Sequence, residues 1–266
     1  MNLNFHQTFK PEKQYLIELL MLADNCFDLT KEEISYATGI PQGKSSGKVL
    51  PHLEYAKYMG LIDYSSNKGK YTIKLTDLGD LVKDEDIGLS EELTILLLHA
   101  MLVRKINGAD LWNFVFQTLP YKYGFCCMID NLKKEANDYF ITSVNITPFK
   151  SSYEDLFSEL NIVSFIDDRI VINETSINNQ YIYLYAYILF EYWELNYPNQ
   201  NEISANELQS LCFRNTFGWS FETEYNVLEQ LASEGLIRFN KQLIPYTVLK
   251  LVDKDILLDK LYSKLF

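Results

Sequence analysis

The chain has 266 residues, of which 47% are hydrophobic, and carries 24 Lys and Arg against 36 Asp and Glu, a net charge of -12. This composition predicts a globular protein with a buried core and excludes a disordered chain. No run of about 18 apolar residues is present, and the first ten residues lack the apolar stretch of a secretory signal. We therefore expect a cytoplasmic protein with no membrane span.

The first 40 residues predict two helices. Leucines on one broad face indicate a helix from about Pro11 to Ala23. Thr30 and Glu33 have the spacing of a capping box, which begins a short helix from Lys31 to Thr38. The glycine and the Ile-Pro step that follow should end this second helix.

The next segment predicts a third helix and a β-hairpin. A polar connection, Gln42 to Lys48, leads into a helical pattern from Val49 to Met59 that Gly60 ends. Two β-rich runs follow, Leu61 to Tyr64 and Lys70 to Leu75. Helix, turn, helix and hairpin in this order predict a winged helix-turn-helix. The alternative is a helical bundle with an incidental hairpin.

The middle of the chain is expected to be mainly helical. A helix that starts at Ser90 and runs to Val103 is apolar almost all round, so it should lie at the centre of the protein. The other expected elements are helices at about Asp110–Leu119 and Asp130–Tyr139, a capped helix carrying Leu156, Phe157 and Leu160, a hairpin at Ile162–Ile172 and a long aromatic helix at Tyr181–Leu195.

The last 70 residues repeat part of the N-terminal pattern. Leu53, Ala56, Gly60, Leu61 and Ile62 have the same spacing as a second set, Leu228, Leu231, Gly235, Leu236 and Ile237. Helices at Ser204–Leu211 and Ser220–Glu234, a hairpin within Leu236–Leu251 and a last helix at Asp253–Leu265 complete this region. A second winged-helix-like module is therefore expected at the C-terminus.

These patterns predict a fold that is mainly α with small β-hairpins. We divide the chain into a winged helix-turn-helix at 1–86, a helical middle domain at 87–197 with its hairpin near 162–172, and a winged-helix-like module at 198–266.

In winged helices that bind duplex DNA, the third helix enters the major groove and the hairpin, or wing, reaches the backbone or the minor groove. Five side chains of this helix and its approach should then face bases or phosphates: Ser45, Ser46, Lys48, His52 and Tyr55. Lys44 lies on the preceding turn, and Lys68 and Lys70 lie on the wing. Pro51 falls inside this helix and could move the contacts by one turn.

Charge is unevenly distributed along the chain. Six Lys face two acidic residues from Pro41 to Leu75, a local balance of +4, so the remainder carries about -16. The segment from Gln200 to Lys250 has four basic residues and six Glu, a balance of -2. We therefore expect the N-terminal module to contact DNA and the C-terminal one to be structural or to face a protein. The alternative is that these lysines are an ordinary solvated surface.

No pattern predicts catalysis, a cofactor or a metal site. Gly39 to Ser45 is one residue short of a phosphate-binding loop and follows a helix rather than a strand. His6 and His99 lie among apolar residues and are expected to be packing residues. The four cysteines have no metal-ligand spacing and should be free thiols. We therefore expect a protein that is not an enzyme.

Several segments together resemble the bacterial and archaeal family called domain of unknown function 4007. They are Phe5–Phe9, the Gly43-Lys44 turn, Leu96–His99 with Ala109–Phe116, and Phe217–Leu231. The family usually has Glu where Gln7 stands and an aromatic residue where Ala100 stands. The resemblance implies genes near sulfur-transfer enzymes of the phosphoadenosine-phosphosulfate-reductase type, in DNA-modification or anti-phage clusters. It implies no known activity.

Two functional interpretations follow. In the first, the protein is a DNA-binding accessory or regulatory protein of such a system, with double-stranded DNA and the products of neighbouring genes as partners. In the second, it is a protein-protein assembly subunit, a scaffold or adaptor without direct DNA contact. The pattern leaves a homo-oligomer open.

Overall fold

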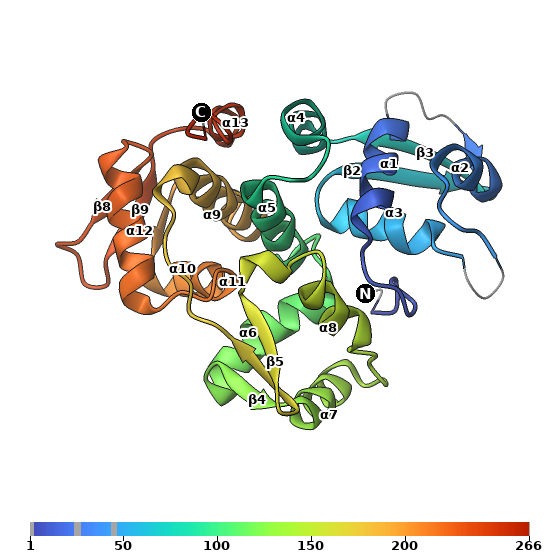
Figure 1. Ribbon diagram of the computed structural model, residues 1–266. Coiled ribbons are helices and arrows are strands. Elements are labelled where there is room, and N and C mark those ends of the chain that lie inside the picture. The colour runs from blue at the N-terminus through green and yellow to red at the C-terminus, as the bar shows by residue number, and fades with distance from the viewer. Residues whose placement is uncertain (1–2, 24–27, 44–46, 266) are drawn as a thin grey trace.

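The computed structural model describes residues 3–23, 28–43 and 47–265. It is mainly helical, with small antiparallel sheets of three strands each, as Figure 1 shows. The expected fold class is therefore confirmed at this level. Within the described residues, no helix has both the length and the apolar character needed to cross a bilayer.

The N-terminal module contains three helices and one sheet. Its elements in chain order are α1 (Lys13–Ala23), β1 (Leu29–Thr30), α2 (Lys31–Thr38), α3 (Val49–Tyr58), β2 (Ile62–Asn67) and β3 (Lys70–Leu75). The short β1 pairs with β3, so the strand order is β1-β3-β2.

The middle module repeats this order of elements. It contains α6 (Asp110–Tyr123), β4 (Cys126–Met128), α7 (Ile129–Phe140), α8 (Thr147–Glu154), the short 3-10 helix η1 (Ser158–Leu160), β5 (Val163–Ile166) and β6 (Arg169–Ile172). Its strand order, β4-β6-β5, matches that of the first sheet. The sequence predicted the helices and hairpin here but not this third copy of the arrangement.

The C-terminal module has the same order once more. It contains α9 (Ile182–Asn196), β7 (Glu202–Ser204), α10 (Ala205–Ser210), α11 (Phe213–Thr216), α12 (Phe221–Ser233), β8 (Ile237–Asn240) and β9 (Thr247–Lys250), with the strand order β7-β9-β8. In this order α9 takes the place that α1 has in the N-terminal module. Figure 1 shows the three modules arranged around the central helix α5 (Glu92–Val103).

Matching local interactions explain why the first and last modules fold alike. Each turns from its first strand into its second helix through a capping box, formed by Thr30 with Glu33 and by Ser204 with Glu207. In each pair the side-chain oxygen accepts from the backbone N–H three residues later, and the Glu carboxylate accepts from the cap backbone N–H.

The end of the third helix is also shared. Gly60 and Gly235 follow α3 and α12 with φ of 75° and 72°, where a residue without Cβ is favoured. The N–H group of the next residue then donates to a carbonyl in the last turns of the helix. Leu61 donates to Ala56 at 2.9 Å, and Leu236 donates to Leu231 at 3.0 Å. The middle module uses Asn161 with φ of 51° at the corresponding position.

The remaining helices join the modules. α4 (Asp77–Asp86) begins at Thr76, whose hydroxyl accepts from the Gly79 N–H at 2.9 Å. A Cβ at Gly79 would lie 1.8 Å from the Leu61 carbonyl oxygen, so glycine allows α4 to pack against the start of the hairpin. The 3-10 helix η2 (Asn179–Tyr181) precedes α9, and α13 (Lys254–Asp259) follows β9.

One sequence expectation fails in this part of the fold. No helix carries Leu156, Phe157 and Leu160: α8 starts earlier and ends at Glu154, and the Phe157 N–H then donates to the Ser152 carbonyl at 2.9 Å before η1 begins. The polar connection expected from Gln42 to Lys48 lies partly outside the described residues, which omit 44–46. At its described ends, the Lys48 N–H donates to the Pro41 carbonyl at 2.8 Å.

Candidate nucleic-acid interface

The third helix of the N-terminal module is covered by the chain itself. Pro51 lies in the first turn of α3, where a missing N–H costs no helical hydrogen bond, so the helix begins at Val49 without a kink. His52 and Tyr55 are therefore where the sequence placed them along the helix. Their surroundings differ from the expectation.

His52 is fully buried and cannot face a DNA base. Its Nε2 accepts from the Glu12 backbone N–H at 3.1 Å, so its Nδ1 carries the proton and donates to the Lys48 carbonyl at 2.8 Å. Burial lowers the pKa of His52 to about 4, which keeps the ring neutral. The prediction that His52 contacts DNA is wrong because the N-terminal segment occupies its outer edge.

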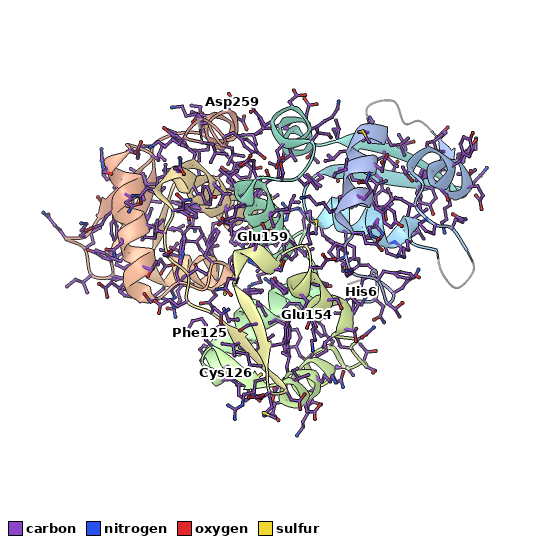
Figure 2. All side chains as sticks on the ribbon, viewed as in Figure 1. His6, Phe125, Cys126, Glu154, Glu159 and Asp259 are labelled. Atoms are coloured by element: carbon purple, nitrogen blue, oxygen red, sulfur yellow. The ribbon has the colours of Figure 1, made fainter. Side chains whose placement is uncertain are left out.

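Tyr55 is fully buried for the same reason. Its hydroxyl donates to the Phe9 carbonyl at 2.9 Å, and its ring meets Phe5 at a centroid distance of 4.9 Å and Trp112 at 6.0 Å. Figure 2 labels His6 in this segment, where the N-terminal module meets the middle module. The prediction for Tyr55 is also wrong, because long-range packing fills the face that would enter a groove.

Lys48 is half-buried and already has an anionic partner. Its Nζ pairs with the Glu12 carboxylate and lies over the rings of Phe9 and Tyr15, 5.4 and 5.6 Å from their centroids. A phosphate could reach this ammonium group only by displacing Glu12. Lys48 is therefore a packing residue in this fold, contrary to the expectation.

Three of the predicted residues, Lys44, Ser45 and Ser46, lie outside the described residues. The flanking Gly43 and Gly47 approach each other closely, since a Cβ at Gly47 would lie 2.8 Å from the Gly43 carbonyl oxygen. The connection follows helix α2 and not a strand, which is the context the sequence analysis used against a phosphate-binding loop.

The hairpin keeps its predicted lysines on the surface. Lys68 and Gly69 form a two-residue turn with φ of 49° and 80°, a geometry that matches the twist of a tight hairpin. Lys68 and Lys70 are exposed. Lys74 is exposed on the same face of β3 as Lys70, four residues along the strand. The sequence analysis missed Lys74, although the strand alternation of Lys70 to Leu75 places it there.

The hairpin lysines have acidic side chains nearby but no direct ionic partner in the described part of the chain. Across the residues that the structure covers, no ion pair involves Lys68, Lys70 or Lys74. Two carboxylates partly offset them. Asp63 on β2 is directly opposite Lys74 in the sheet register, and the pKa of Glu33 on α2 is lowered by hydrogen bonds at the helix cap and also by the charge of Lys70. We call these three lysines and the Lys68-Gly69 turn the basic hairpin.

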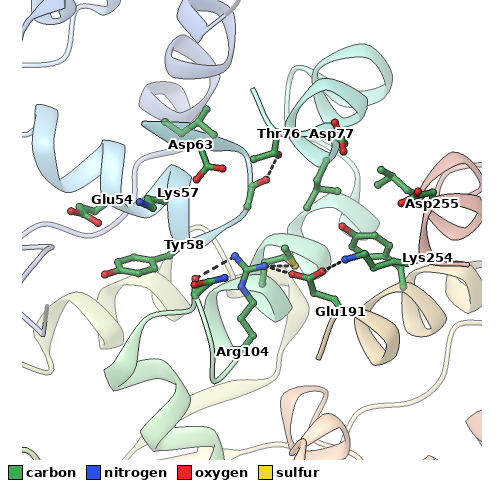
Figure 3. A pocket seen from close by; sticks show the side chains of 17 residues that line it. Glu54, Lys57, Tyr58, Asp63, Thr76, Asp77, Arg104, Glu191, Lys254 and Asp255 are labelled. Carbon is green, nitrogen blue, oxygen red and sulfur yellow. Dashed lines mark hydrogen bonds and ion pairs between the residues drawn. The ribbon is translucent and has the colours of Figure 1, made fainter. Parts of the chain in front are cut away.

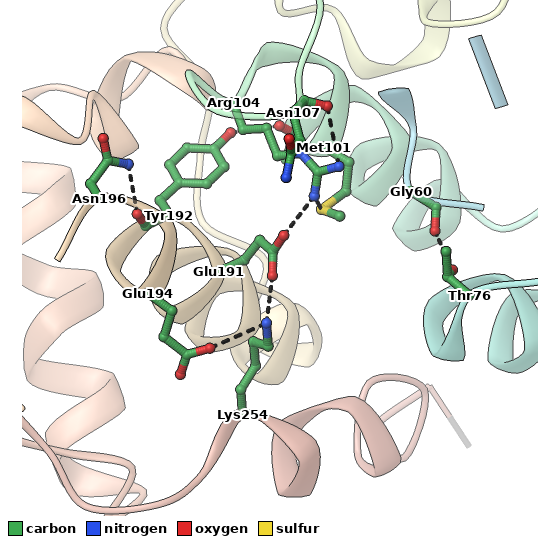
Figure 4. Close-up of polar contacts among 11 residues, drawn as sticks. Gly60, Thr76, Met101, Arg104, Asn107, Glu191, Tyr192, Glu194, Asn196 and Lys254 are labelled. Atoms are coloured by element: carbon green, nitrogen blue, oxygen red, sulfur yellow. Dashed lines mark hydrogen bonds and ion pairs between the residues drawn. The ribbon is translucent and has the colours of Figure 1, made fainter. Parts of the chain in front are cut away.

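A cleft of about 650 Å³ lies at the end of β2 and β3 away from the Lys68-Gly69 turn, between the N-terminal module, α4, α5, α9 and α13 (Figure 3). A chain of ion pairs lies in this cleft (Figure 4). The Glu191 carboxylate lies 2.6 Å from Arg104 Nη1 and 2.6 Å from Lys254 Nζ. Lys254 Nζ also lies 3.2 Å from the Glu194 carboxylate. The Arg104 side chain is only 8% exposed. These charges satisfy one another and connect α5, α9 and α13.

The carboxylates of this cleft do not form a metal site. Glu54, Asp63, Asp77 and Asp255 line it from separate elements, as Figure 3 shows. In the ranges 3–23, 28–43 and 47–265, no three His, Cys, Asp or Glu side chains are grouped so that they could hold a metal ion.

His99 is a satisfied packing residue, as the sequence predicted. Its Nε2 donates to the Thr216 carbonyl at 2.8 Å, so its Nδ1 accepts from the Tyr153 hydroxyl at 2.9 Å. Burial lowers the pKa of His99 to about 4. The ring thus holds α5, α8 and α11 together as a neutral group. His6 is also buried, although its Nε2 has no partner among the described residues.

The described cysteines, Cys126, Cys127 and Cys212, are free thiols, and Cys26 lies outside the described residues. Burial raises the pKa of Cys127 and raises that of Cys212 to about 11. Thiolates are the reactive form, so neither sulfur is activated as a nucleophile.

Comparisons with known proteins show a likeness in fold. No family model matches the sequence, and no curated protein matches it. Two solved structures are similar to the chain: magnesium ion-bound SspB, with a TM-score of 0.78 and 16% identity, and SspB, with a TM-score of 0.77 and 17% identity. Each alignment covers 98% of this chain and 88% of the other chain. At this identity the likeness shows that the whole chain shares their fold.

Proposed function

We propose that the protein binds duplex DNA through the basic hairpin, as an accessory or regulatory protein of a bacterial DNA-modification or anti-phage system. The observation that carries this proposal is a short hairpin with three exposed lysines, which form no ion pair with any described residue, on a chain whose net charge is -12. Helix, strand, two helices and a hairpin in this order support a winged helix for the N-terminal module. The cellular setting rests on the family resemblance alone.

The contact we propose differs from the usual one for such modules. Insertion of α3 into a groove would require the N-terminal segment to leave His52 and Tyr55, with loss of the Glu12 and Phe9 hydrogen bonds. Exposure of a buried aromatic residue alone costs about 2 kcal/mol or more. The hairpin needs no rearrangement, because its lysines already project into solvent. A wing can reach phosphates or the minor groove without the helix.

The expected binding is weak, salt-dependent and not specific for sequence. Neutralisation of about three phosphates gives a slope of roughly -3 for log affinity against log salt. Phosphate contacts fix position on DNA but read no bases. The proposed role is therefore binding rather than catalysis, and specificity would come from partners.

Fluorescence anisotropy with a labelled duplex, titrated over a range of salt, tests the proposal. The double variant Lys68→Glu with Lys70→Glu should weaken binding at least tenfold at low salt. A matched control, Lys133→Glu with Lys134→Glu, makes the same change in net charge on α7 of the middle module. Equal affinity for the hairpin variant and the wild-type protein, or an equal loss in the control, would contradict the proposal.

A second candidate is a protein-protein assembly subunit. It is favoured by large apolar side chains exposed on the middle module, above all Tyr121 and Ile141, which are each 92% exposed. Exposed aromatic and aliphatic side chains of this kind mark interaction surfaces when they are contiguous. Pull-down with the products of adjacent genes, in the presence of nuclease, separates this function from DNA-mediated association.

A further inference from the structure

A second cleft, of about 590 Å³, lies between the middle and C-terminal modules. The C-terminal end of α6 forms one wall, and α11 with the start of α12 forms the other. This cleft shares no residue with the basic hairpin or with the ion-paired cleft.

The inner end of the cleft holds a buried carboxylate. Glu224, in the first turn of α12, is 4% exposed, and its Oε2 lies 3.5 Å from Arg214 Nη1. Burial raises the pKa of Glu224 to about 7, and the nearby Arg214 opposes this shift only in part. Near neutral pH this group can therefore both accept and donate hydrogen bonds.

Two carboxamides line the same cleft without internal partners. The Gln117 Nε2 atom is buried and has no hydrogen-bond partner within the described residues. A buried polar atom without a partner costs free energy, so such atoms commonly mark a site for a ligand or water. Asn215 on α11 adds a second amide at the opposite wall, and no hydrogen bond of its side chain occurs among the described residues.

The mouth of the cleft carries exposed aromatic rings. Tyr121, which follows Pro120 in the last turns of α6, is almost completely exposed, and Phe125 is 39% exposed. Figure 2 labels Phe125 at the side of the middle module that faces α10 and α11. An aromatic ring that covers nothing in its own protein is available for stacking.

We infer that this cleft binds an unpaired nucleobase, presented as a nucleotide. Tyr121 or Phe125 would stack on the ring, while Gln117, Asn215 and Glu224 hydrogen-bond its edge. Bases have a flat π-face and an edge with both donors and acceptors, which matches this combination of groups. A duplex cannot enter a cleft of this size without extrusion of a base, so the site would select single-stranded or flipped nucleotides.

Binding of mononucleotides to the full chain tests this inference without duplex DNA. Calorimetric or saturation-transfer titration with dAMP, dCMP, dGMP and dTMP should detect at least one ligand. Deoxyribose 5-phosphate, which lacks the base, should not bind. Binding of the sugar phosphate as tightly as the nucleotides, or no binding of any nucleotide at millimolar concentration, would overturn the inference.

Variants locate the site. Tyr121→Ala removes a side chain with almost no packing role, so the fold should be kept, and nucleotide binding should fall by about tenfold. Gln117→Leu should weaken it to a similar extent. Tyr139→Ala is the matched control, because Tyr139 is an exposed tyrosine of α7 that does not line the cleft. Unchanged binding in Tyr121→Ala and Gln117→Leu together would contradict the inference.

The two proposals fail separately. Lys68→Glu with Lys70→Glu should leave mononucleotide binding unchanged, and Tyr121→Ala should leave duplex binding by the hairpin unchanged. Loss of mononucleotide binding in the hairpin variant would place the nucleotide site at the hairpin and overturn the assignment to this cleft.

Discussion

The hairpins of the N-terminal and middle modules have the same turn geometry, but the charges of their turn residues are opposite. Both are closed by two-residue turns with positive φ at each residue, Lys68-Gly69 at 49° and 80° and Asp167-Asp168 at 47° and 59°. The first tip is basic and the second is acidic. The middle module from 110 to 172 has five basic and nine acidic residues, a balance of -4. The shared arrangement therefore sets the shape of a module but not its partner.

The third helices differ in the titratable group that they bury. α3 buries its own His52, and α8 of the middle module contacts the buried His99 of the central helix α5 through Tyr153, so both helices pack against a neutral imidazole. α12 of the C-terminal module buries a carboxyl group, Glu224. Buried bases and buried acids respond to pH in opposite directions, and this makes the modules distinguishable by stability measurements.

The largest expected effect is acid destabilisation through His52 and His99. Both have a folded-state pKa of about 4, below the unfolded value of 6.5. The unfolded chain therefore binds protons first as pH falls, and the free energy of unfolding drops by about 2 kcal/mol per histidine between pH 7 and 5. The unfolding free energy can be measured with denaturant at pH 7 and pH 5. Between these values, His52→Gln and His99→Gln should each lose about 2 kcal/mol less unfolding free energy than the wild-type protein. Equal losses in wild type and variants would contradict this assignment.

Glu224 should change the unfolding free energy in the opposite direction as pH falls, by about half of the combined change from His52 and His99. Its folded pKa is raised from 4.5 to about 7, so the folded protein binds the proton first and gains stability as pH falls. From pH 7 to 5 the gain is about 2 kcal/mol. Glu224→Gln lacks this gain, and its unfolding free energy should fall more steeply on acidification than that of the wild-type protein. A variant with the wild-type slope would show that Glu224 is not protonated in this range.

The sequence fixes local structure well where the signals are local. The capping box at Thr30 places the start of α2, and the alternation from Lys70 to Leu75 gives the bounds of β3 as observed. It also places Lys68 and Lys70 on the surface, because a tight turn between strands has no room for burial.

What the sequence could not provide depends on contacts between distant segments. Glu12 covers His52 and Phe9 covers Tyr55, from 40 and 46 residues away, and no periodicity of α3 indicates these contacts. The third copy of the module escaped notice because Asn161 replaces the glycine that marks the helix end elsewhere. The cleft at Glu224 needs α6 beside α11 and the start of α12, which only the fold supplies.

Exchange of the hairpin tips tests the comparison between the first two modules. Asp167→Lys with Asp168→Gly copies the basic tip onto the middle module and fits the backbone, since glycine suits the positive φ at position 168. If tip charge determines DNA binding, the exchange should raise duplex affinity several-fold at low salt and restore part of the loss caused by Lys68→Glu with Lys70→Glu. Anisotropy titration measures both. No gain in either background would mean that the position of the N-terminal hairpin, and not its charge, is what matters.

The smallest expected effect belongs to Lys74, which lies opposite Asp63 in the sheet. The carboxylate partly offsets its charge, so Lys74→Gln should weaken duplex binding only about two- to threefold, less than either tip lysine. If Lys74 contacts a phosphate, the slope of log affinity against log salt should also become shallower by about 1. Asp63→Asn is the complementary change: it leaves Lys74 without its cross-strand carboxylate and should strengthen binding by a similar factor. A strengthened Lys74→Gln variant, or a weakened Asp63→Asn variant, would place the DNA on another face of the hairpin.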